Sequence, residues 1–79
     1  MQTSGMFEQI KRALETAPPN GYVAELHLQI LKHADLLEGM SGREFCEKLD
    51  LNRSWGAEFA KMKKISRRLR DAGLRPELI

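Results

Sequence analysis

Apolar side chains recur along this chain at steps of three and four positions, and no stretch shows the strict alternation of a strand. Such spacing places the apolar residues on one face of a helix. The pattern predicts four helices, at about residues 4–17, 22–38, 42–49 and 53–72. The expected fold class is therefore all-α: a compact bundle of about four helices that forms a single helical domain over residues 1–79.

Proline and glycine mark the ends of these helices. Pro18 and Pro19 stop the first helix, and Gly39 suits a left-handed position after the second. Gly73 and Pro76 end the fourth. Only six residues follow Gly73, which is too few for a β-hairpin, so we expect no wing.

The third helix begins with the most specific local signal in the chain. The stretch SGRE fits a capping box, in which the Ser41 hydroxyl accepts from the Glu44 amide and the Glu44 carboxylate accepts from the Ser41 amide. Asp50 tolerates a left-handed backbone and is expected to end this helix, after which Asn52 caps the next. A helix, a short turn and a longer helix thus follow one another within residues 41–72.

The fourth helix is expected to have two different sides. Its core side carries Trp55, Phe59, Met62, Ser66 and Leu69. The opposite side carries small residues first and basic residues further along. These are Ala57, Ala60, Lys61, Lys64, Arg67 and Arg68. This side therefore combines close approach of the backbone with positive charge.

Charge is divided unevenly along the chain, although the formal net charge is only +2. Residues 1–52 hold five basic and eight acidic residues, and residues 53–79 hold eight basic and three acidic. This division favours a polyanionic partner for the C-terminal third, with a solvated helix face as the alternative. The start of the chain lacks the order of a secretory signal and no run is long enough to span a membrane, so we expect a cytoplasmic location without membrane contact.

Catalytic and metal-binding patterns are absent from the sequence. No Gly-rich phosphate loop, cysteine pair or nucleophile–base arrangement occurs, so we expect neither enzyme activity nor a cofactor. His27 and His33 would lie about 120° apart around one helix, which is wrong for a shared metal ion. The single cysteine, Cys46, is interpreted as a small buried packing residue and not as a redox switch.

Residues 41–65 resemble the bacterial helix-turn-helix DNA-binding module. Cys46 corresponds to the family's small residue near the helix crossing, Asp50 to its glycine-like turn residue, and Leu51 and Phe59 to its apolar anchors. Gly56 stands where the family prefers Val or Ile. The resemblance implies a small transcriptional regulator that inserts the helix starting at Arg53 into the major groove.

The residues expected at the DNA fall into two groups. Candidates for base edges are Arg53, Ser54, Ala57, Glu58 and Lys61, and candidates for phosphates are Arg43, Lys64, Arg67 and Arg68. Gly56, Ala57 and Ala60 would let the backbone approach the groove. For Arg53 a guanine contact, a phosphate contact and a solvated side chain are all open. Glu58 could accept from cytosine, pair with Lys61, or contact a neighbouring helix.

The expected function is sequence-specific binding of double-stranded DNA. A homodimer through the N-terminal half would place two reading helices on half-sites one helical turn apart. The alternative is an antitoxin-like or polymerase-associated adaptor that uses the same helices to bind an acidic protein partner. RNA binding is disfavoured, because exposed aromatic residues are lacking.

Overall fold

The computed structural model describes residues 2–79, and its regular elements there are all helical. The α-helices are α1 (Gln2–Thr16), α2 (Tyr22–Lys32), α3 (Gly42–Leu49) and α4 (Trp55–Asp71), and the 3₁₀ turns are η1 (Pro19–Gly21) and η2 (Pro76–Leu78). The expected all-α fold of four helices is confirmed. No strand, and hence no wing, occurs in this part of the chain.

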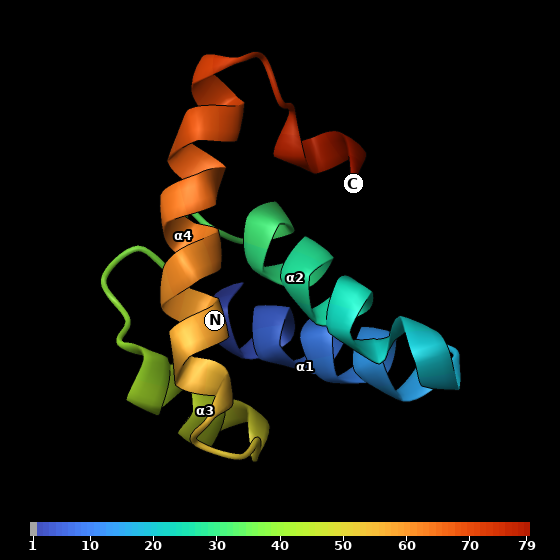
Figure 1. The fold of residues 1–79 in the computed structure, drawn as a ribbon. Coiled ribbons are helices and arrows are strands. Elements are labelled where there is room, and N and C mark those ends of the chain that lie inside the picture. The colour runs from blue at the N-terminus through green and yellow to red at the C-terminus, as the bar shows by residue number, and fades with distance from the viewer. Residues whose placement is uncertain (1) are drawn as a thin grey trace.

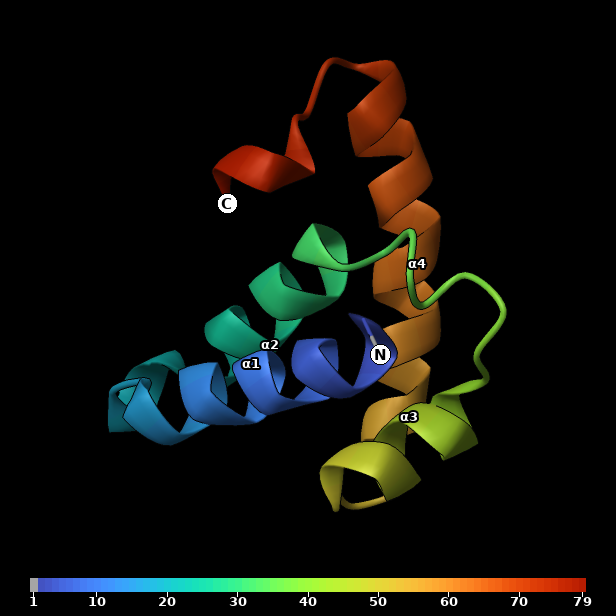
Figure 2. The ribbon, with the colours of Figure 1, turned by 180° about the vertical axis from the view of Figure 1, so that it is seen from behind.

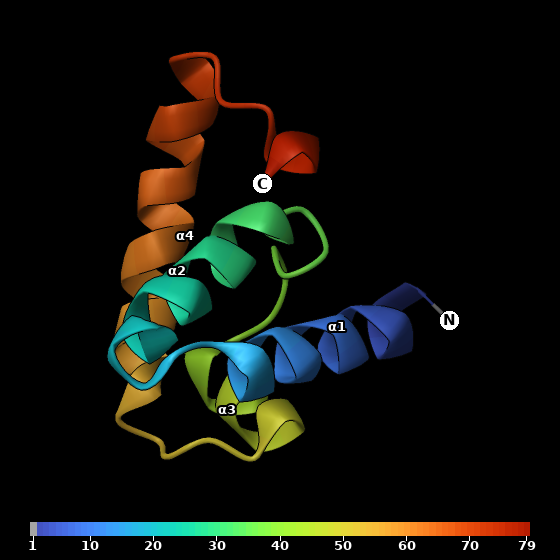
Figure 3. The same cartoon turned by 90° about the vertical axis from the view of Figure 1, so that its right-hand side faces the viewer.

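The helices are arranged as a hairpin crossed by a long helix. Figures 1 and 2 show α1 and α2 side by side, with the chain reversed between them at η1. Helix α4 packs against α2, and α3 lies beside the N-terminal part of α4 and also contacts α1. The view in Figure 3 shows that the C-terminal segment turns back toward the end of α2. Both ends of α4 are therefore held by other parts of the chain.

The core lies where these helices meet. Phe45 of α3 and Phe59 of α4 stack with their ring centroids 4.4 Å apart, and both side chains are almost completely buried. Stacked aromatic pairs of this kind add to the free energy of burial. The other buried members of this cluster are Met6, Phe7, Ile10, Leu14, Leu26, Ile30, Leu31, Leu37, Leu49 and Met62. The core thus joins all four helices.

Helix α2 is shorter than the sequence predicts. It ends at Lys32 and not at residue 38, and a series of hydrogen-bonded turns follows. In these turns the Leu37 amide donates to the carbonyls of His33 (3.1 Å) and Ala34 (3.2 Å). Ala34 and Leu37 stay buried, so the apolar periodicity continues although the regular helix has ended. Gly39 has no left-handed backbone, and the positive φ of 108° belongs to Gly73.

Helix α4 begins two residues later than predicted, at Trp55 and not at Arg53. Asn52 explains the delay, because its carbonyl accepts from the Trp55 amide (3.0 Å) and its side chain accepts from the Ser54 amide (2.9 Å). These bonds close a separate turn over residues 52–55 before the regular helix starts. The expectation that Asn52 caps this helix is therefore wrong: Ser54 holds the position before the helix, and Asn52 closes the turn that precedes it.

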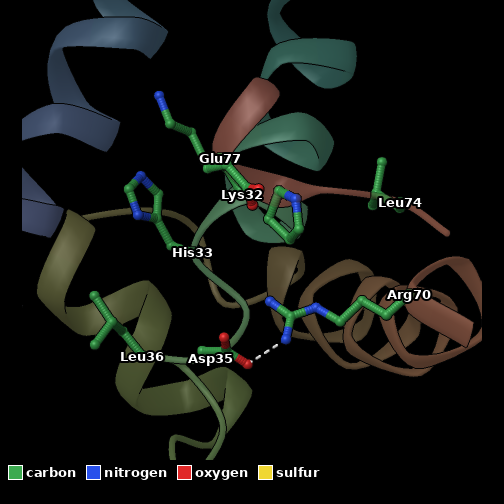
Figure 4. A pocket seen from close by; sticks show the side chains of 8 residues that line it. Lys32, His33, Asp35, Leu36, Arg70, Leu74 and Glu77 are labelled. Atoms are coloured by element: carbon green, nitrogen blue, oxygen red, sulfur yellow. Dashed lines mark hydrogen bonds and ion pairs between the residues drawn. The ribbon is translucent and has the colours of Figure 1, made fainter.

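The far end of α4 is tied to the turns that follow α2. Arg70 forms an ion pair with Asp35, across a pocket of about 690 Å³ that Figure 4 shows from close by. His33, Leu36 and Leu74 line the same pocket. Beyond Gly73 the Leu74 amide donates to the Leu69 carbonyl (2.9 Å), which closes the helix end and turns the chain back. This end of α4 is thereby fixed in its orientation.

Candidate nucleic-acid interface

Helix α3 starts and stops as its sequence predicts. The Ser41 hydroxyl accepts from the Glu44 amide (3.1 Å), and the Glu44 carboxylate accepts from the Ser41 amide (3.2 Å). Asp50 then takes a left-handed backbone with φ 58° and ψ 43°, and the Leu51 amide donates to the Cys46 carbonyl (2.8 Å). The capping box and the turn together fix the ends of α3 and therefore the direction in which the chain continues to α4.

The backbones of α3 and α4 meet at two glycines. A Cβ atom on Gly42 would lie 2.7 Å from the Gly56 carbonyl oxygen, a distance at which no side chain fits. Gly56 therefore faces α3 and not the exposed side of α4. The small residues on that exposed side are Ala57 and Ala60. Cys46 is buried as expected. The position at the helix crossing that excludes a side chain, however, is Gly42.

The exposed side of α4 gathers several of the expected site residues. Ala57, Lys61, Lys64 and Arg68 follow one another at steps of three and four residues, and all are exposed. Arg53 and Ser54 are exposed in the turn that precedes the helix. The structure thus places small residues near the start of this face and cations toward its far end.

Glu58 lies at the edge of this face and is held by two partners. Its Oε1 lies 2.9 Å from His27 Nε2 on α2, and its Oε2 accepts from Lys61 Nζ at 3.1 Å. The hydrogen bond from His27, followed by that from Lys61, lowers the pKa of the Glu58 carboxyl. Of the contacts that the sequence left open for Glu58, the structure contains both the pair with Lys61 and the contact with a neighbouring helix.

The cations expected at phosphates differ in their partners. Arg67 pairs with Glu38 at 2.8 Å and Arg43 with Glu47 at 3.5 Å, and both arginines are exposed. Exposed pairs of this kind contribute little to stability, so a phosphate can replace the carboxylate. Lys64 and Arg68 have no carboxylate within ion-pair distance among residues 2–79.

A small pocket lies beside the N-terminus of α3 and has positive charge at its rim. Its volume is about 280 Å³, and it is lined by Ser41, Gly42, Ala60, Lys64 and Arg67, among others. Helix N-termini and cations both attract anions. The Ser41 and Glu44 amides at this helix end are already bonded within the capping box, so the groups at the pocket that would attract an anion are the side chains of Lys64 and Arg67.

Lys63 has a role that the sequence analysis missed. Its ammonium donates to the carbonyls of Glu38 (3.0 Å) and Met40 (2.9 Å) and lies 4.9 Å from the centre of the Phe59 ring. These contacts hold the connection between α2 and α3 against α4. No local sequence pattern indicates these contacts, because both carbonyl acceptors lie more than twenty residues away in sequence.

Other kinds of site find little support in the described residues. No group of three His, Cys, Asp or Glu side chains in residues 2–79 is placed to hold a metal ion. Burial raises the pKa of the Cys46 thiol, which disfavours the reactive thiolate. In the same range no helix is both long and apolar enough to cross a membrane.

Comparison with known proteins adds one match. A family model described as an HTH-like domain matches residues 2–72, a stretch that includes α1, α2, α3 and α4. The match therefore extends well beyond the residues 41–65 in which the sequence resembles a helix-turn-helix. No curated protein and no solved structure matches the chain.

Proposed function

This chain belongs to the HTH-like domain family, and we propose that it binds double-stranded DNA sequence-specifically as a small transcriptional regulator. The N-terminal half of α4, together with the turn before it, would enter the major groove. The observation that carries the proposal is the exposed face of α4, on which small residues are followed by cations. A regulator of this kind would act in the cytoplasm, by binding and without catalysis.

The proposed contacts follow from exposure along this face. Arg53, Ser54, Ala57 and Lys61 are assigned to base edges, because they lie at or near the exposed start of α4. The phosphate contacts are assigned to Arg43, Lys64, Arg67 and Arg68, which flank that region. For Arg67 and Arg43, DNA binding would exchange an exposed carboxylate partner for a phosphate.

The test is fluorescence anisotropy of labelled duplex DNA at about 50 and about 200 mM salt. Wild-type protein should bind random-sequence duplex and lose affinity steeply with salt, and selection from a random pool should then yield a preferred site. The double substitution Lys64→Gln and Arg68→Gln should reduce the slope of log affinity against log salt by about 2.

Arg12→Gln is the control for loss of a cation outside α4, because Arg12 is exposed on α1. It should leave affinity and salt slope close to those of the wild type. Absence of binding at about 50 mM salt would overturn the proposal, and so would an equal loss of affinity in Arg12→Gln.

We also propose a homodimer on DNA, formed through the N-terminal half. Leu28 on α2 is 42% exposed, which leaves an apolar side chain on that half for contact with a second copy. Two copies would bind half-sites one helical turn apart. Sedimentation that finds only monomer at high micromolar concentration, with and without the selected duplex, would contradict this part.

The adaptor function makes a different prediction for the same face. Ala57→Glu combined with Lys61→Glu places two carboxylates on the exposed side of α4, and DNA binding should collapse. A protein partner held by α1 and α2 would still bind this variant. Retention of DNA binding would contradict the proposed contacts.

A further inference from the structure

Glu58 is unusual on the proposed DNA face because of its charge. It is the only acidic residue between Arg53 and Arg70, and about 29% of its side chain is exposed. Both carboxylate oxygens already take part in a hydrogen bond within the protein, so the group is oriented by His27 and Lys61 before any DNA is bound. A negative charge in this place opposes attraction to phosphates, so its presence needs a different explanation.

We propose that Glu58 is a positioning residue that determines specificity: it holds Lys61 in a fixed place on α4 and opposes binding to DNA of the wrong sequence. This inference rests on the proposed function. Non-specific binding comes almost entirely from charge, so one negative charge on the interface weakens it directly. Cognate DNA offsets that cost through contacts made by the ordered Lys61, whereas other sequences do not.

His27 links this arrangement to the body of the protein. Because the ionised Glu58 carboxylate can only accept, His27 Nε2 donates in this contact, which joins α2 to α4 by a hydrogen bond. The charged groups that face His27 in this contact are Glu58 and, on the other carboxylate oxygen, Lys61. This contact holds the Glu58 carboxylate in place at the edge of the exposed α4 face.

The test compares the duplex selected from a random pool with a scrambled duplex of equal length. Glu58→Gln keeps a side chain of the same shape but removes the charge, so the scrambled duplex should bind about 3- to 10-fold tighter at low salt. The ratio of selected to scrambled affinity should fall by a similar factor. Glu15→Gln is the matched control, because Glu15 is an exposed carboxylate on α1 and forms no ion pair with a residue assigned to the DNA. It should change both affinities by less than about 2-fold.

A variant that keeps the charge separates this role from a purely structural one. Glu58→Asp retains the negative charge on α4 but shortens the side chain, so its affinity for the scrambled duplex should stay within about 2-fold of the wild type. Circular dichroism confirms that each variant is folded. Glu58→Ala removes the same charge and provides a second test if Glu58→Gln does not fold.

Three results would overturn the inference while leaving the proposed function standing. One is an unchanged affinity ratio in folded Glu58→Gln. Another is a change of preference at a single base pair without tighter scrambled binding, which would make Glu58 a base-reading residue. The last is an affinity for the scrambled duplex that rises as much in Glu58→Asp, which keeps the negative charge, as in Glu58→Gln. Failure of the wild-type protein to bind any duplex would instead overturn the proposed function.

Discussion

Gly42 and Gly56 bring the backbones of α3 and α4 into contact, but only one of the two positions excludes a side chain. A Cβ atom on Gly42 would lie 2.7 Å from the carbonyl oxygen and 2.9 Å from the Cα atom of Gly56. A Cβ atom on Gly56 would come no closer than 3.5 Å to any atom of Gly42, which is ordinary contact. The two glycines therefore differ in what a single methyl group would cost.

Gly42→Ala should destabilise the protein by about 1–3 kcal/mol, because α3 and α4 must move apart to accommodate the methyl group. Gly56→Ala should be neutral or stabilising by up to about 1 kcal/mol, because alanine favours the helix. Urea unfolding followed by circular dichroism measures both. Equal midpoints for the two variants would contradict the close approach at Gly42.

The capping box of α3 gives a second prediction. Ser41→Ala removes the acceptor for the Glu44 amide and should cost about 1 kcal/mol in the free energy of unfolding. Ser54→Ala is the control, because Ser54 precedes α4 without any side-chain capping bond. Its unfolding midpoint should match the wild type, and a loss as large as that of Ser41→Ala would count against the assigned cap.

His33 makes stability depend on pH. Burial, and then the charge of Lys32, lower the pKa of His33, so the unfolded chain takes up the proton first as the pH falls. The free energy of unfolding should therefore decrease once the pH drops below about 6.5, and should be unaffected by this group at higher pH.

Urea midpoints at about pH 7.5 and 5.5 measure the effect of His33. The range stays above the pKa of Glu58, which is lowered, so that carboxylate remains ionised throughout. His33→Gln should show a smaller loss of stability on acidification than the wild type. An equal loss of stability in both proteins would show that His33 is not its cause.

The thiol of Cys46 should react slowly with thiol reagents in the folded protein. Its side chain is only 1% exposed and burial raises its pKa, so little thiolate is available to a reagent. A colorimetric disulfide reagent at neutral pH should react slowly with native protein and fast in denaturing urea. Fast reaction without denaturant would show that the α3–α4 region opens readily.

Signals confined to a few neighbouring residues could be interpreted from the sequence. The capping box at Ser41 and the left-handed Asp50 depend on backbone groups within one turn, and both are present. The core side of α4 followed from its periodicity, and Phe59, Met62 and Ser66 are indeed buried. For such features residue type and local spacing contain most of the information.

Features that depend on distant segments could not be predicted in the same way. Gly42 matters only because Gly56 crosses it, and the exact partner of Glu58 on α2 is His27, 31 residues away. The end of α2 was misplaced because hydrogen-bonded turns keep Leu37 on the buried side as a longer helix would. The spacing of apolar residues indicates which side chains are buried, but it does not distinguish a continued helix from a series of hydrogen-bonded turns.

Lys63 restricts how the exposed face of α4 can evolve or be redesigned. Its ammonium donates hydrogen bonds to two carbonyl groups of the connection between α2 and α3. Arg70 similarly binds the turns after α2 through its ion pair with Asp35. Replacing either residue to alter affinity for a partner would also loosen the scaffold. Variation can therefore accumulate at Ala57, where it would alter base preference, and at Lys64 and Arg68, where it would alter affinity, because these exposed side chains form no ion pair with another segment.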